Sequence, residues 1–130
     1  MQMFQKAGPY HFNDPDHLLI GRGILSQEEE QTQFALWAIS KAPLIITANL
    51  TTLPYDSQAI LSNQWLINVN QDKLGQQANC TYNCQYNTAP TDTIQTFQAQ
   101  IEETATGGAY IVVVAVNWDD EQPAALAYDL

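Results

Sequence analysis

Residues 26–48, SQEEEQTQFALWAISKAPLIITA, decide the fold class of this 130-residue chain. Ser26 and Glu29 have the spacing of a helix capping box, and the glutamates of the first turn suit the positive end of the helix dipole. An apolar face that begins at Phe34 indicates that the helix packs against another element. The stretch therefore predicts a helix that begins after Ser26 and is ended by Pro43.

A short apolar run at residues 44–48 follows this helix directly. It is rich in β-formers and does not alternate, which indicates a strand buried on both faces, as in a parallel sheet. A helix followed at once by a buried strand is the unit of an α/β fold. Residues 56–70 are then expected to be helical, with Asp56 or Ser57 as the N-cap and Asn63 capping a second segment.

The second half of the chain has a different character. Residues 76–93 are polar and predict a connector, whereas residues 94–101 and 109–118 predict an antiparallel pair of strands and residues 124–128 a third strand. The order is α/β first and all-β second, and neither part is large enough to bury its own sheet. We therefore expect a fragment, truncated at the front and at the back, that is unstable, oligomeric or aggregation-prone in isolation.

The charge of the chain excludes some classes of partner. Acidic residues outnumber basic ones by 14 to 4, and the formal net charge is −10. Such a surface repels phosphate backbones, so no nucleic-acid partner is expected, while neutral sugars meet no such repulsion. No stretch approaches the roughly 20 apolar residues that span a bilayer, so no membrane partner is expected either.

Signals of export occur in the middle of the chain. Asn49 and Asn79 each begin an Asn-X-Thr glycosylation sequon. Cys80 and Cys84 are typical of a small disulfide loop, with free thiols as the alternative, and two cysteines cannot complete a four-ligand zinc site. Residues 1–6 lack the features of a signal peptide, so we expect the true N-terminus to lie upstream.

A series of short motifs occurs in one order between residues 7 and 75. They are AGP at 7–9, NDPDHLLIG at 13–21, ALWA at 35–38, KAPLI at 41–45, NL at 49–50 and INVNQDKLG at 67–75. Together they resemble the α-galactosidase/α-N-acetylgalactosaminidase family of retaining glycoside hydrolases, family 27 or the melibiases. Beyond residue 75 only the β-rich character fits this family.

The resemblance implies a TIM (β/α)8 barrel followed by an antiparallel β-sandwich domain. Residues 1–72 would hold the last two β/α units of the catalytic barrel, with residues 44–48 as its eighth strand. Residues 73–130 would be the start of the β-domain. The loop at residues 13–17 would lie on the catalytic face, at the C-terminal ends of the barrel strands.

A retaining glycosidase needs two carboxyl groups about 5–5.5 Å apart. The resemblance implies that both catalytic aspartates come from earlier strands, so no catalytic residue is expected in this chain, which alone should be inactive. Asp16 matches a residue that lines the galactose pocket, the alternative being that it caps the loop or forms an ion pair. His17 stands where the family usually has methionine and is expected in the pocket wall.

Other candidate residues have structural interpretations. Asn13 and Asp14 are expected to support the loop, because Asx side chains near proline commonly close turns. Trp37 and Trp65 lie on apolar helix faces and are expected in the core. Trp118, at a strand end, is the one tryptophan left open for stacking on a sugar.

The function implied by the resemblance is cleavage of terminal α-linked galactose from oligosaccharides or glycoconjugates, with an α-galactoside as partner and no cofactor or metal. The residues that choose between galactose and N-acetylgalactosamine would lie in the missing strands, so α-N-acetylgalactosaminidase specificity is an alternative. Further alternatives are a non-catalytic sugar-binding or remnant protein and a metal site at Asp14 and Asp16. The full-length protein is expected to be secreted or lysosomal, and its homodimeric state is left open.

Overall fold

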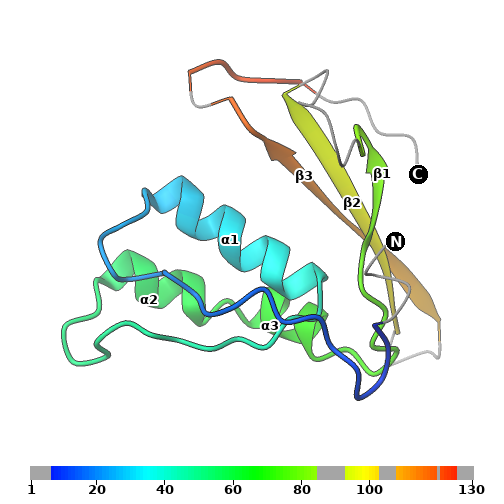
Figure 1. Ribbon diagram of the computed structural model, residues 1–130, viewed down its shortest axis with the longest axis horizontal. Helices are drawn as coiled ribbons and strands as arrows, with labels where there is room; N and C mark the ends of the chain where they lie inside the picture. The colour runs from blue at the N-terminus through cyan, green and yellow to red at the C-terminus, as the bar shows by residue number, and fades with distance from the viewer. Residues whose placement is uncertain (1–6, 85–92, 103–107, 120, 126–130) are drawn as a thin grey trace.

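A computed structural model describes residues 7–84, 93–102, 108–119 and 121–125. In chain order the elements are the helices α1 (Gln27–Ile39), α2 (Tyr55–Leu61) and α3 (Gln64–Asn70), then the strands β1 (Asn79–Tyr82), β2 (Ile94–Glu102) and β3 (Ala109–Asn117). Figure 1 shows the helices gathered on one side of the molecule and the long strands of the sheet on the other, with α1 between α2 and the sheet. The structure thus contains helices in its first half and an antiparallel sheet in its second half.

Helix α1 begins as predicted. Ser26 Oγ accepts a hydrogen bond from Glu29 N (3.2 Å), and Glu29 Oε2 accepts one from Ser26 N (2.7 Å), so the capping box is complete. The helix ends at Ile39, before Pro43, because Lys41 takes a left-handed φ of 56°. This turn directs the chain back along the helices toward residues 44–48.

The second helical stretch is divided in two. Asn63 caps α3 as predicted, since its Oδ1 accepts hydrogen bonds from the amides of the helix's first turn. The N-cap predicted for α2 is wrong, because Pro54 occupies that position and both Asp56 and Ser57 lie inside the helix. Ser57 is buried there and its hydroxyl donates to Glu30 Oε2 (2.7 Å).

The strand predicted at residues 44–48 is reduced to a single parallel bridge. Leu18 pairs with Ile46, and Leu18 N donates to Ile45 O (2.8 Å). The expectation of burial on both faces is also wrong, since Ile45 is 49% exposed and Ile46 is 43% exposed. The physical reason is that a strand is buried only between neighbours, and within the described part of the chain this one has a partner on one side only.

The sheet has the order β1-β2-β3 with antiparallel neighbours. The predicted β2–β3 pair is confirmed, in unbroken register from Ile94 opposite Asn117 to Glu102 opposite Ala109. Strand β1 differs from the prediction, because its four residues lie within the mostly polar stretch at residues 76–93 that predicts a connector. The third strand predicted at residues 124–128 falls mostly on residues outside the described part, and residues 124–125 are not in a strand.

Two apolar clusters hold the helices and the sheet together. One joins the end of α1 and α3 to the sheet, and the other lies beneath α1; their buried members are Ile39, Val69, Ala78, Ala99 and Val112 in the first, and Leu18, Ile20, Phe34 and Ile60 in the second. Trp37 packs, partly buried, against the second cluster. The core position predicted for Trp65 is wrong, because this side chain is 61% exposed in the first turn of α3, where no described element covers it.

Candidate functional site

Asp16 and His17 form a close pair in the loop before Leu18. Asp16 has a left-handed φ of 76°, and its Oδ1 accepts a hydrogen bond from His17 N (2.8 Å) and lies 2.7 Å from His17 Nδ1. The Asp16 side chain is exposed and that of His17 is half-buried. The backbone N–H of His17, and then its imidazole, lower the pKa of Asp16 below the ordinary value for a carboxyl group. The site therefore presents an ionised carboxylate to solvent.

Neighbouring side chains hold this loop in shape. Asp14 Oδ1 accepts a hydrogen bond from Asp16 N (2.9 Å), which closes an Asx turn around Pro15. Asn13 Nδ2 donates to Gln77 Oε1 and so ties the loop to the segment that precedes β1. On the helix side, the backbone carbonyl of Asp16 accepts a hydrogen bond from Trp37 Nε1 (3.1 Å).

The carboxylate of Asp16 is the reactive group that this loop presents to solvent. Within the described residues, no group of three or more His, Cys, Asp or Glu side chains lies close enough together to hold a metal ion. One carboxylate oxygen of Asp14, Oδ1, accepts a hydrogen bond from the backbone of the turn. The Asp16 side chain, in contrast, is exposed to solvent, and its Oδ1 contacts His17. Such an oxygen can accept hydrogen bonds from hydroxyl groups.

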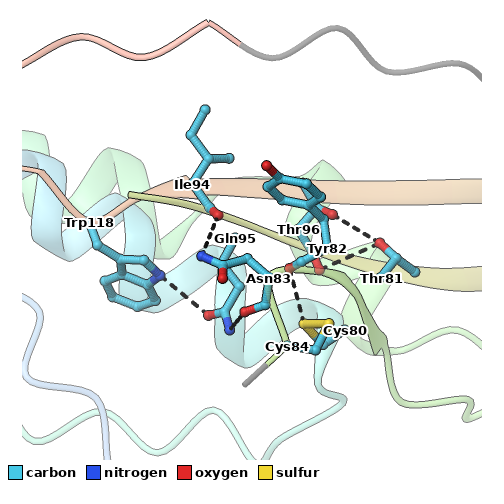
Figure 2. Close-up of a disulfide and its surroundings, with 9 residues drawn as sticks. All are labelled: Cys80, Thr81, Tyr82, Asn83, Cys84, Ile94, Gln95, Thr96 and Trp118. Atoms are coloured by element: carbon cyan, nitrogen blue, oxygen red, sulfur yellow. Dashed lines mark hydrogen bonds between the residues drawn. A yellow bond between two sulfur atoms is a disulfide. The ribbon is translucent and has the colours of Figure 1, made fainter. Parts of the chain in front are cut away.

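Cys80 and Cys84 form a disulfide at the end of β1, with their Cα atoms 5.6 Å apart. Figure 2 shows this loop against the start of β2. Asn83 takes a left-handed φ of 55°, donates to Ile94 O (3.1 Å) and accepts from Gln95 Nε2 (3.1 Å). The disulfide thus closes a small loop that is bonded to the sheet through Asn83.

Trp118 extends from this corner of the sheet toward α1. Its Nε1 donates to Gln95 Oε1 (3.3 Å), as Figure 2 shows, and the side chain is 49% exposed. It lines a groove of about 770 Å³ whose other wall includes Leu36 and Trp37 of α1. The lining of this groove includes neither Asp16 nor His17, so Trp118 and the loop at residues 13–17 do not share a pocket.

The two sequons lie on exposed positions. Asn49 Oδ1 accepts hydrogen bonds from Thr51 N (3.1 Å) and Thr51 Oγ1 (2.8 Å), and Asn79 is exposed at the start of β1. No helix in the described part of the chain is long and apolar enough to cross a membrane.

A buried ion pair joins the helices to the sheet, and no local sequence pattern predicts it. Lys41 Nζ donates to Val69 O and lies 3.9 Å from Asp72 Oδ1, while Asp72 Oδ2 accepts from Glu102 N (2.8 Å). Burial lowers the pKa of Lys41, and the charge of Asp72 opposes that effect. Lys41 and Asp72 are far apart in sequence, so only the folded chain could show that they meet.

Comparison with known proteins gives one family. The family described as alpha galactosidase A has a model that matches residues 1–72. Alpha-N-acetylgalactosaminidase of Gallus gallus is 48% identical over 71 residues, which are 55% of this chain and 18% of that protein. Alpha-galactosidase of Oryza sativa subsp. japonica is 45% identical over 71 residues, 55% of this chain and 17% of that protein.

Solved structures are similar over more of the chain. The structure of α-galactosidase from Saccharomyces cerevisiae with raffinose superposes with a TM-score of 0.71 at 35% identity, and covers 88% of this chain and 25% of that chain. The similarity in structure therefore continues past residue 72 into the sheet. This chain spans less than a fifth of the length of the curated relatives named above.

Proposed function

Because this chain belongs to the alpha galactosidase A family, as the matching motifs at residues 7–75 indicated, we propose that it is part of a retaining glycoside hydrolase that releases terminal α-linked galactose. The supporting structure with raffinose, an α-galactoside, is that of the Saccharomyces cerevisiae enzyme. Retaining hydrolysis needs two carboxyl groups on opposite sides of the scissile bond.

The parallel bridge between Leu18 and Ile46 is the observation that carries the proposed architecture. Helix α1 connects these two segments, so the segments and the helix form a β-α-β unit like those that build a (β/α)8 barrel. We assign residues 1–72 to the last two β/α units of such a barrel. Residues 73–130 then belong to an antiparallel β-sandwich domain, of which β1, β2 and β3 are the described strands.

Asp16 and His17 are the proposed sugar-binding residues. The backbone N–H and the imidazole of His17 lower the pKa of the exposed Asp16 carboxyl group and so favour its ionised form. A carboxylate of this kind accepts hydrogen bonds from sugar hydroxyl groups. Asn13 and Asp14 support the loop through their contacts with Gln77 and with Asp16 N.

A second specificity has support of its own. The Gallus gallus relative is an α-N-acetylgalactosaminidase, and its identity to this chain is similar to that of the rice α-galactosidase. The two activities differ at the 2-position of the sugar, so the same pocket with different neighbouring residues would serve either. The disulfide at Cys80 and the exposed sequons at Asn49 and Asn79 support a secreted or lysosomal glycoprotein.

The test begins with the coding sequence upstream of this chain. We expect it to continue into a barrel, and the resulting protein to hydrolyse p-nitrophenyl α-galactoside faster than p-nitrophenyl α-N-acetylgalactosaminide.

Asp16→Asn should lower kcat/KM by about 10- to 100-fold, because one charged hydrogen bond to the substrate is lost. Asp119→Asn is the control, because the Asp119 carboxylate accepts hydrogen bonds from the backbone of residues 121–122 and not from the loop. Equal kcat/KM values for the wild-type protein and Asp16→Asn would remove Asp16 from the pocket.

A further inference from the structure

Three side chains on one face of α1 bind the backbone of residues 16–21. The bonds run from Trp37 Nε1 to Asp16 O (3.1 Å), from Leu19 N to Gln33 Oε1 (2.9 Å) and from Gly21 N to Glu30 Oε1 (2.7 Å). Positions 30, 33 and 37 follow the i, i+3, i+7 spacing of a single helical face. Figure 1 shows this part of the chain running alongside α1, and the order of the bonds shows that it runs in the opposite direction.

The far end of this contact is firmly anchored. Glu30 is 5% exposed, and its second carboxylate oxygen accepts from Ser57 Oγ (2.7 Å). Gly21 has a φ of 78°, and a Cβ at this position would overlap Leu53 Cδ1 in the loop before α2, so any other residue here would be strained and would displace Leu53. Residues 16–21 therefore have one end whose position is set by buried groups.

The near end is held by Trp37 alone among the α1 side chains. Its indole N–H binds the carbonyl of Asp16, a residue whose left-handed backbone is unfavourable for any residue except glycine. The Asp16 carbonyl and the His17 N–H belong to the same planar peptide unit, so a bond that holds the carbonyl also fixes the orientation of the N–H. That N–H is the donor to Asp16 Oδ1. The contact from Trp37 thus reaches the carboxylate through one peptide unit.

We infer that Trp37 is a positioning residue for the Asp16–His17 pair. Its indole ring packs against the apolar cluster beneath α1, and its N–H holds the peptide between Asp16 and His17 so that the carboxylate and the imidazole stay together. Gln33 and Glu30 hold the remainder of the segment on the same helix face. The kinetic consequence of this role rests on the proposed function of Asp16 in sugar binding, whereas the structural consequence does not.

Trp37→Phe tests the inference, because it keeps an aromatic ring and removes only the N–H donor. In the full chain, NMR titration of the Asp16 carboxyl should show its pKa rising toward the ordinary value of about 3.9, since His17 N is no longer held toward Oδ1. Trp65→Phe is the matched control, because Trp65 is exposed on α3 and should leave the Asp16 titration unchanged. An unchanged Asp16 titration in Trp37→Phe would overturn the inference.

Two further measurements cover the other outcomes. In the wild-type chain the indole N–H of Trp37 should exchange with solvent more slowly than that of Trp65, and equal exchange would overturn the inference even if Trp37→Phe failed to fold. In the longer enzyme, Trp37→Phe should lower kcat/KM about 10-fold through misplacement of Asp16. A wild-type enzyme without glycosidase activity would contradict the proposed function alone, because the Asp16 titration is measured without substrate.

Discussion

At the scale of single residues, the chemistry of the loop comes from Asp16 and the residue that follows it. The first cause of its lowered pKa is the backbone N–H of His17, and the second is the charge of the imidazole. A folded-state pKa below the unfolded value means that the contribution to stability is present above the unfolded pKa and is lost as the pH falls through the folded pKa. The Asp16–His17 contact is therefore a feature of neutral and mildly acidic solution.

The two causes can be separated with one substitution. His17→Ala removes the imidazole and keeps the backbone N–H, so the pKa of Asp16 should rise part of the way toward the ordinary value. NMR titration of the Asp16 carboxyl measures this directly. His11→Ala is the control, because the His11 ring contacts Pro9 O and not Asp16. A complete return to the ordinary pKa in His17→Ala would show that the backbone hydrogen bond contributes nothing.

At the scale of elements, the first turn of α1 stabilises the start of the helix, and later positions of α1 bind residues 16–21. Its first turn is held by the capping box of Ser26 and Glu29, which depends on neighbours in sequence. One face of the helix then binds the segment before it through Glu30, Gln33 and Trp37. The capping box therefore also stabilises the helical positions of Glu30, Gln33 and Trp37. Fraying of the first turn would weaken the hydrogen bonds that these side chains make to residues 16–21.

Ser26→Ala should therefore destabilise the chain by about 1 kcal/mol, the usual effect of removing an N-cap side chain. The midpoint of urea unfolding, followed by circular dichroism, measures this. Ser40→Ala is the matched control at the other end of α1, where the cap contact is made by the backbone N–H of Ser40 and not by its hydroxyl. Equal unfolding midpoints for the two variants would contradict the role of the Ser26 hydroxyl.

At the scale of the whole molecule, a helical layer is joined to a sheet, and one edge of the structure is open. The join is made by the cluster around Ile39 and Val69 and by the buried pair of Lys41 and Asp72. The open edge is the segment at residues 44–50, where Ile45, Ile46 and Leu50 are all exposed. Exposed apolar side chains beside an unpaired backbone favour association with other chains.

The isolated chain should therefore self-associate through this edge. Light scattering after size-exclusion chromatography should show species larger than a monomer, and Ile45→Lys with Leu50→Lys should shift the population toward the monomer. Ile24→Lys is the control, since Ile24 is also exposed but lies in the loop before α1. A monomeric wild-type chain with a sharp cooperative melt would refute this expectation.

The sequence by itself determined the features that depend on near neighbours or on a repeating pattern. These include the capping box at Ser26, the break at Asn63, the antiparallel pair β2–β3 and the disulfide of Cys80 and Cys84. Each follows from contacts within a few residues or from a run of β-forming residues bounded by turn signals. The ordered motifs also indicated the family, which the comparison confirmed.

Only the tertiary structure decided which segments meet. The exposure of Trp65, the single bridge at Ile46, the short strand β1 and the contact between Trp37 and Asp16 O all depend on residues distant in sequence. Whether such a position is buried or hydrogen-bonded depends on which other segment of the chain packs against it. A strand or an apolar helix face is covered only where another element contacts it. A local pattern carries no information about that partner.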